Sequence, residues 1–104
     1  MASGLAVVDF GDFPGSTHAS VAVAQQAEIP SDAIVRAWID RRATTDHSAD
    51  EHTVERFVVT AGDVVAGTGF TIHVVLQDTA LPPSGAAPMA WGEWGVAWEW
   101  SRRV

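Results

Sequence analysis

FTIHVVLQ, residues 70–77, is the most regular stretch of this chain. Every second residue from Phe70 to Leu76 is large and apolar, and most of the residues between them are polar. Successive side chains of a β-strand point to opposite faces, so a period of two predicts a strand with one face in a hydrophobic core. The stretch is also too short for an amphipathic helix. We therefore take it as an inner strand of a sheet.

Similar patterns lie on both sides of this strand. Further candidate strands are AVVDF (6–10), SVAVAQ (20–25), AIVRAWID (33–40), TVERFVVT (53–60) and WGEWGVAWEW (91–100). AIVRAWID has apolar residues at both parities, so we expect it to be covered on both faces. VVAGTGF (64–70) has glycines typical of a kink or bulge. DTALPPSGAAPM (78–89) holds three of the five prolines and predicts a surface loop.

Six or seven short strands at roughly ten-residue spacing, separated by Gly, Pro and Asp turns, predict an all-β fold. The connections are too short for the helices that a parallel sheet needs. A chain of 104 residues suffices for one hydrophobic core. We predict a single-domain antiparallel β-sandwich, jelly-roll-like, that spans residues 1–104.

The composition excludes several functions. The net charge is −7, and the six basic residues are all arginines, so nucleic acid is not expected as a partner. No cysteine is present, which excludes disulfides, thiolate nucleophiles and sulfur-ligated zinc. No apolar run approaches a membrane span, and the N-terminus lacks the basic region of a signal peptide. We expect a soluble chain that is not exported and contacts no membrane.

Four of the five tryptophans lie in WGEWGVAWEWSRRV (91–104). In a strand, one parity of this segment is apolar throughout, so Trp94 and Trp98 are expected in the core. Trp91 and Trp100 are the candidates for exposed binding aromatics. Because Trp and Arg are enriched at protein interfaces, we add Arg102 and Arg103 to this candidate interface.

DHSADEHTVE (46–55) is the one segment that resembles a chemical site. His47, Glu51 and His52 could contribute metal ligands, but two histidines five residues apart do not match the helical zinc motif. A solvated turn is the simpler interpretation, and we predict no metal and no cofactor. His18 and His73 are single histidines at polar positions, expected to be solvated. No nucleophile elbow or phosphate-binding loop is present, so the sequence predicts no catalytic residue and no enzyme.

Four stretches together carry a resemblance to a known group of proteins. They are DFGDFPGSTHASVAV (9–23), AWIDRRATTDHSADEHTVE (37–55), VVAGTGFTI (64–72) and WGVAWEW (94–100). In this order they resemble small proteins encoded by tailed bacteriophages and prophages. The resemblance covers nearly the whole chain apart from residues 78–89. It implies a place in the virion, after synthesis in the bacterial cytoplasm, and it transfers no catalytic residue.

These observations predict a non-enzymatic bacteriophage virion accessory protein. A capsid decoration or cement role is favoured, and a tail-associated structural role is the nearest variant. The expected partners are other virion proteins, such as the major capsid protein or tail proteins, and further copies of the same chain, because repetition strengthens weak contacts. The alternative is a carbohydrate-binding module for host surface glycans, suggested by the density of tryptophans beside acidic residues.

Overall fold

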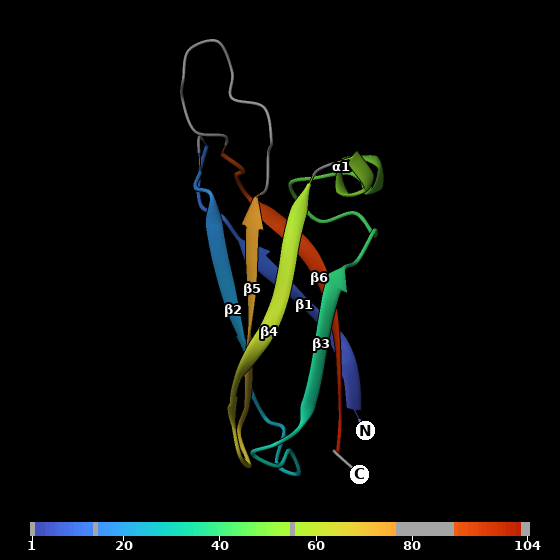
Figure 1. Ribbon diagram of the computed structural model, residues 1–104. Helices are drawn as coiled ribbons and strands as arrows, with labels where there is room; N and C mark the ends of the chain where they lie inside the picture. The colour runs from blue at the N-terminus through green and yellow to red at the C-terminus, as the bar shows by residue number, and fades with distance from the viewer. Residues whose placement is uncertain (1, 14, 55, 77–88, 103–104) are drawn as a thin grey trace.

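The computed structural model describes residues 2–13, 15–54, 56–76 and 89–102, and these residues form strands and one short helix. In chain order the elements are β1 (Ala2–Asp9), β2 (His18–Val23), β3 (Ile34–Ile39), α1 (Ala49–Val54), β4 (Phe57–Val65), β5 (Gly69–Leu76) and β6 (Glu93–Ser101) (Figure 1).

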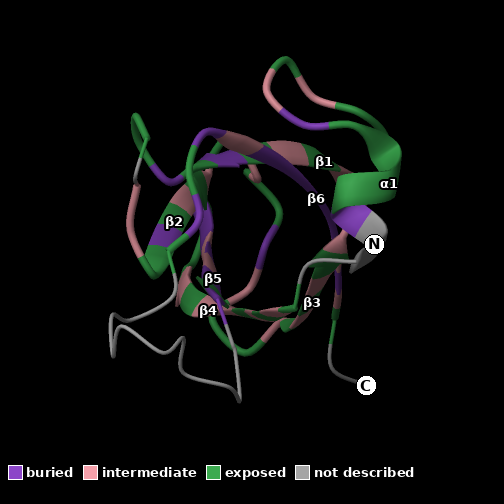
Figure 2. Ribbon diagram, turned by 90° about the horizontal axis from the view of Figure 1, so that it is seen from above, coloured by how far each residue is buried: buried purple, intermediate pink, exposed green. Residues whose placement is uncertain are grey.

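The strands pair into two three-stranded sheets, with the orders β1-β6-β3 and β2-β5-β4. All four pairings are antiparallel. At the margins of the two sheets, β3 lies next to β4 and β1 lies next to β2. Seen along the strands, the two sheets therefore surround a common interior (Figure 2). The predicted all-β sandwich of antiparallel strands is confirmed.

The core lies between the two sheets and follows the parity of the central strands. On β5, Phe70, Ile72, Val74 and Leu76 are all buried, as the alternation of FTIHVVLQ predicts. On β6, the buried residues of the inner parity are Trp94, Val96, Trp98 and Trp100. Each central strand is flanked by partners on both sides, which explains why its inner side chains lose nearly all contact with water.

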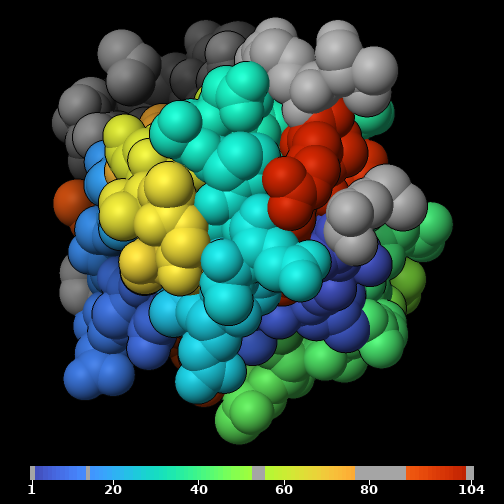
Figure 3. Space-filling model, turned by 90° about the horizontal axis from the view of Figure 1, so that it is seen from below, coloured from blue at the N-terminus to red at the C-terminus, as the bar shows by residue number. Residues whose placement is uncertain are grey.

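The segment between β2 and β3 closes one end of this core. Ile29 is only 2% exposed, although it lies outside any strand. The backbone fixes the segment there, because Gly67 N–H donates to the Ile29 carbonyl at 2.9 Å and Gln26 N–H donates to the Thr68 carbonyl at 2.9 Å. Seen from below, residues 24–33 lie between the turn joining β4 to β5 and the end of β6 (Figure 3). An apolar side chain is thus inserted where the strands end.

Two expectations about the strands are wrong. AIVRAWID is not covered on both faces, because Trp38 is 46% exposed and Ile34 is 38% exposed. The strand expected over residues 53–60 begins only at Phe57, since the residues up to Val54 belong to α1. The surface loop predicted for residues 78–89 falls outside the described residues except for its last position.

Candidate interaction surface

The side of the β1-β6-β3 sheet that faces away from the core carries a group of exposed apolar side chains. We call this group the outer apolar face. It consists of the exposed Leu5, Val7, Ile34 and Trp38, with the buried Gly95 and Ala97 of β6 on the same side of the sheet. The two largest contributions from β1 and β3 are Leu5, which is 54% exposed, and Trp38, which is 46% exposed. Clustered apolar residues on a sheet face are a feature of interaction sites.

The register of the strands shapes this face. Leu5 of β1 and Trp38 of β3 both pair with Ala97 of β6, so the two large side chains stand on either side of a small one. Gly95 follows two positions earlier on the same side of β6. The small side chain of Ala97 therefore lies lower than its two large neighbours, while Gly95 is covered by the backbone around Asp40. Next to the central strand lies a groove of about 290 Å³, lined among others by Leu5, Val7 and Gly95.

Charged pairs lie within and beside the outer apolar face. Arg36 Nε lies 3.6 Å from Glu99 Oε1 across β3 and β6. Arg42 Nε lies 3.0 Å from Asp40 Oδ2 where the chain leaves β3. Exposed pairs of this kind contribute little to stability. Trp and Arg are both enriched at protein interfaces, and this side of the sheet presents Trp38 next to Arg36.

The tryptophans predicted to bind lie elsewhere. Trp91 is 37% exposed, and its indole packs edge-on against Phe13 with 6.4 Å between ring centroids. Trp100 is only 4% exposed, so the prediction that it faces solvent is wrong. It shares the inner parity of Trp98, and its Nε1–H donates to Gln26 Oε1 at 2.9 Å. The segment that closes the core therefore covers this indole.

The two arginines of the candidate interface are only partly described. Arg102 is exposed, and its guanidinium donates to the Glu28 carbonyl at 3.2 Å. It thus lies beside the segment that closes the core and away from Trp91. Arg103 is outside the described residues. The structure does not bring Trp91, Trp100 and Arg102 together into one surface.

The segment after β3 continues the pairing of β6. β3 ends at Ile39, opposite Val96, and beyond this point the segment supplies partners for the β6 backbone. Asp40 N–H donates to the Gly95 carbonyl at 3.0 Å, and the Asp46 carboxylate accepts the Glu93 N–H at 2.7 Å. The Thr44 hydroxyl donates to the Glu93 carbonyl at 2.6 Å. The backbone of Asp40 and the side chains of Thr44 and Asp46 thus provide hydrogen-bond partners for β6 backbone groups that lie beyond the end of β3.

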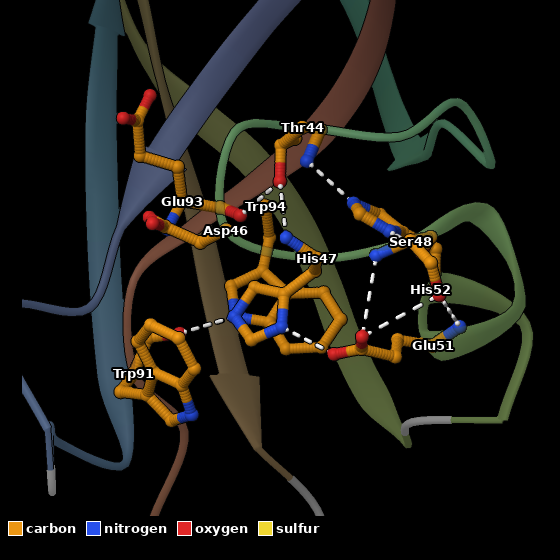
Figure 4. Close-up of polar contacts among 10 residues, drawn as sticks. Thr44, Asp46, His47, Ser48, Glu51, His52, Trp91, Glu93 and Trp94 are labelled. Carbon is orange, nitrogen blue, oxygen red and sulfur yellow. Dashed lines mark hydrogen bonds and ion pairs between the residues drawn. The ribbon is translucent and has the colours of Figure 1, made fainter.

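The cluster of His47, Glu51 and His52 lies at the same edge of β6, as Figure 4 shows. His47 lies with Nε2 2.6 Å from the Trp91 carbonyl, and its ring stacks on Trp94 with centroids 3.7 Å apart. His52 donates from Nδ1 to the Ser48 carbonyl at 2.8 Å, and its Nε2 accepts the Gly95 N–H at 3.0 Å.

Both histidines are buried, so the expectation of a solvated turn is wrong. The two ring nitrogens of each are already used in hydrogen bonds, with Glu51 taking Nδ1 of His47. Across the described residues, no three His, Cys, Asp or Glu side chains gather in a way that could hold a metal ion. The geometry gives His47, Glu51 and His52 a structural role.

Glu51 provides the one pKa shift that can be tested in this cluster. Its hydrogen bond from His47, followed by that from the Ser48 N–H, holds the pKa of Glu51 below its ordinary value of 4.5. A carboxyl whose pKa is lower in the folded state stabilises the fold above its unfolded pKa, and this contribution is lost as pH falls through the folded pKa. Glu51→Gln should therefore be less stable than the wild type at neutral pH.

Urea midpoints measured from about pH 7 down to about pH 3 would check this expectation. The difference between wild type and Glu51→Gln should begin to shrink below pH 4.5 and be lost as the pH falls through the lower pKa of the folded state. The effect is modest because the Glu51 side chain is 51% exposed. A difference that stays constant over the whole range would contradict the assigned ion pair.

Comparison with family models, curated proteins and solved structures gave no match, so function has to be inferred from the residues of this chain. Over the described ranges, no helix is long and apolar enough to cross a membrane.

Proposed function

We propose that this chain is a non-enzymatic accessory protein of a bacteriophage virion, which attaches to another virion protein through the outer apolar face. The observation that carries the proposal is this face itself, in which Leu5 and Trp38 stand exposed on either side of Ala97. The four stretches that resemble tailed-phage proteins supply the virion setting. A capsid decoration or cement role is favoured over a tail-associated one.

The arrangement suits binding on a repetitive particle. The face lies on a sheet whose three strands are held by continuous pairing, so little backbone ordering has to accompany association. Buried aromatic anchors dominate the binding energy of most interfaces, and Trp38 is the large aromatic on this face. Many copies on a symmetric particle would multiply a moderate affinity.

The test is co-sedimentation of the purified chain with empty particles of the parent phage. Trp38→Ala should weaken binding by about 30-fold, the effect of losing an anchor worth about 2 kcal/mol. Trp91→Ala is the matched control, because it truncates another half-exposed tryptophan outside the outer apolar face. Both variants should remain folded. Unchanged binding by Trp38→Ala, or loss only with Trp91→Ala, would reject the proposed surface.

The alternative function is a carbohydrate-binding module. It is favoured by one arrangement, in which Trp38 is followed by Asp40 and its partner Arg42 at the margin of the groove. Sugars stack on exposed aromatics while polar neighbours bind their hydroxyls. On this hypothesis host glycans shift the tryptophan fluorescence of the wild type but not of Trp38→Ala. Binding to particles without any response to glycans separates the two functions.

A further inference from the structure

Two histidines that are 55 residues apart meet on the other sheet. His18 of β2 and His73 of β5 lie on the outward side of β2-β5-β4, where His18 pairs with Val75 and His73 pairs with Ser20. The two histidines are therefore diagonal neighbours across an antiparallel pair. His18 Nε2 lies 3.3 Å from His73 Nδ1, and the two rings are nearly parallel, with an angle of 16° between them.

A carboxylate orients the second ring. Asp63 Oδ2 lies 3.0 Å from His73 Nε2. A carboxylate is an acceptor, so Nε2 carries the proton and Nδ1 of His73 presents its lone pair to His18. This is the arrangement of a metal-binding histidine, whose second nitrogen donates to a carboxylate that fixes the tautomer.

The backbone places Asp63 for this contact. The register of β4 and β5 is interrupted between Gly62 and Val65, which makes a β-bulge. Asp63 lies within it at a φ of 53°, a left-handed conformation that few residues other than glycine adopt. Bulges redirect side chains, and here the redirected carboxylate contacts His73.

The spacing of the nitrogens fits a small divalent ion. Two Zn–N bonds of about 2.0–2.1 Å at a tetrahedral angle separate the two nitrogens by about 3.3 Å. The nitrogens of His18 and His73 have this separation already. The pair is accessible, since His18 is exposed and the side chains of His73 and Asp63 are 36% and 69% exposed. For both nitrogens to bind one ion, each ring has to turn so that its lone pair points to that ion.

We propose that His18 Nε2 and His73 Nδ1 form an open binding site for Zn²⁺, with water in the remaining positions and Asp63 as a positioning residue. Imidazole is a preferred ligand of zinc. Without the ion, His18 donates its Nε2 proton to His73 Nδ1, and binding moves that proton to the other nitrogen of His18 or to solvent. The site lies on the sheet opposite the outer apolar face and does not depend on the proposed function.

The test is isothermal titration of the full chain, purified without a histidine tag and freed of metal, with zinc chloride at about pH 7.5. One Zn²⁺ should bind per chain. His18→Gln and His73→Gln should each abolish this binding. Asp63→Asn should weaken it by about 10–100-fold while leaving the stoichiometry unchanged, because the ligands remain and only their orientation is lost.

Asp50→Asn is the matched control, since it removes an exposed carboxylate from helix α1, which lies on the opposite side of the molecule from β2, and it should bind zinc as the wild type does (Figures 1 and 2). Circular dichroism of each variant shows that the fold is retained, as expected for exposed positions. Affinity should also fall at acid pH, because protons compete with the metal ion for the ligand nitrogens. No saturable binding to the wild type, or binding that survives His18→Gln, would overturn the assignment.

Discussion

Trp98→Ala is expected to lower the free energy of unfolding by about 3–5 kcal/mol. Trp98 is only 7% exposed and meets the Phe70 ring of the facing sheet edge-on, with centroids 5.4 Å apart. Its partners in register are Gly4 and Ala37, two small residues that leave space for the indole. Neither can fill the cavity that truncation would create. Urea unfolding followed by circular dichroism measures the loss without relying on tryptophan fluorescence.

Glu99→Ala is the control for this prediction because it lies on the same strand with the opposite parity. Glu99 faces outward, and its contact with Arg36 is 3.6 Å long and exposed. Removing it should change stability by no more than about 0.5 kcal/mol. Comparable losses in Trp98→Ala and Glu99→Ala would show that β6 does not present these two residues to opposite sides.

The sheets could be predicted because the inner faces of their central strands, β5 and β6, follow a period of two. Phe70 to Leu76 alternate without interruption, and the parity of β6 sends Trp94 and Trp98 inward as expected. Trp100 shares that parity, yet its place near the chain end suggested exposure. Its burial depends on the segment around Gln26, which is 74 residues away, and no local pattern reveals such a contact.

The exposed face of β3 was partly visible in the sequence. Arg36 lies between Ile34 and Trp38 at the same parity, and a charge at that position favours a solvent-facing side. The apolar residues on both parities outweighed this signal in the prediction. A parity pattern shows which residues share a face, but the number of layers that cover the sheet is a tertiary property.

Helix α1 also had a local signal. Ser48 and Glu51 form a capping box, in which the Ser48 hydroxyl accepts the Glu51 N–H and the Glu51 carboxylate accepts the Ser48 N–H, both at 3.3 Å. The pattern Ser-x-x-Glu was readable in DHSADEHTVE. The burial of His47 and His52 and the meeting of His18 with His73 were not, because each depends on a partner strand distant in the sequence.

His52→Ala is expected to cost about 2–4 kcal/mol of stability. The His52 side chain is buried, and its Nε2 accepts the N–H of Gly95, which is also buried. Truncation would leave a cavity and a buried donor without its acceptor, and an unpaired buried group costs more than an average hydrogen bond contributes. Urea unfolding gives the overall loss, and hydrogen exchange at the Gly95 amide reports the local one.

Two variants separate these contributions. His52→Gln keeps an acceptor of similar reach, so it should retain part of the stability and of the protection of the Gly95 amide. Asp50→Ala, an exposed change in the same helix, should cost no more than about 1 kcal/mol, since it removes only a favourable charge in the first turn. If His52→Gln were as unstable as His52→Ala, packing alone would explain the effect. A stable His52→Ala would instead mean that the β6 edge is held by Asp40, Thr44 and Asp46 without the histidine.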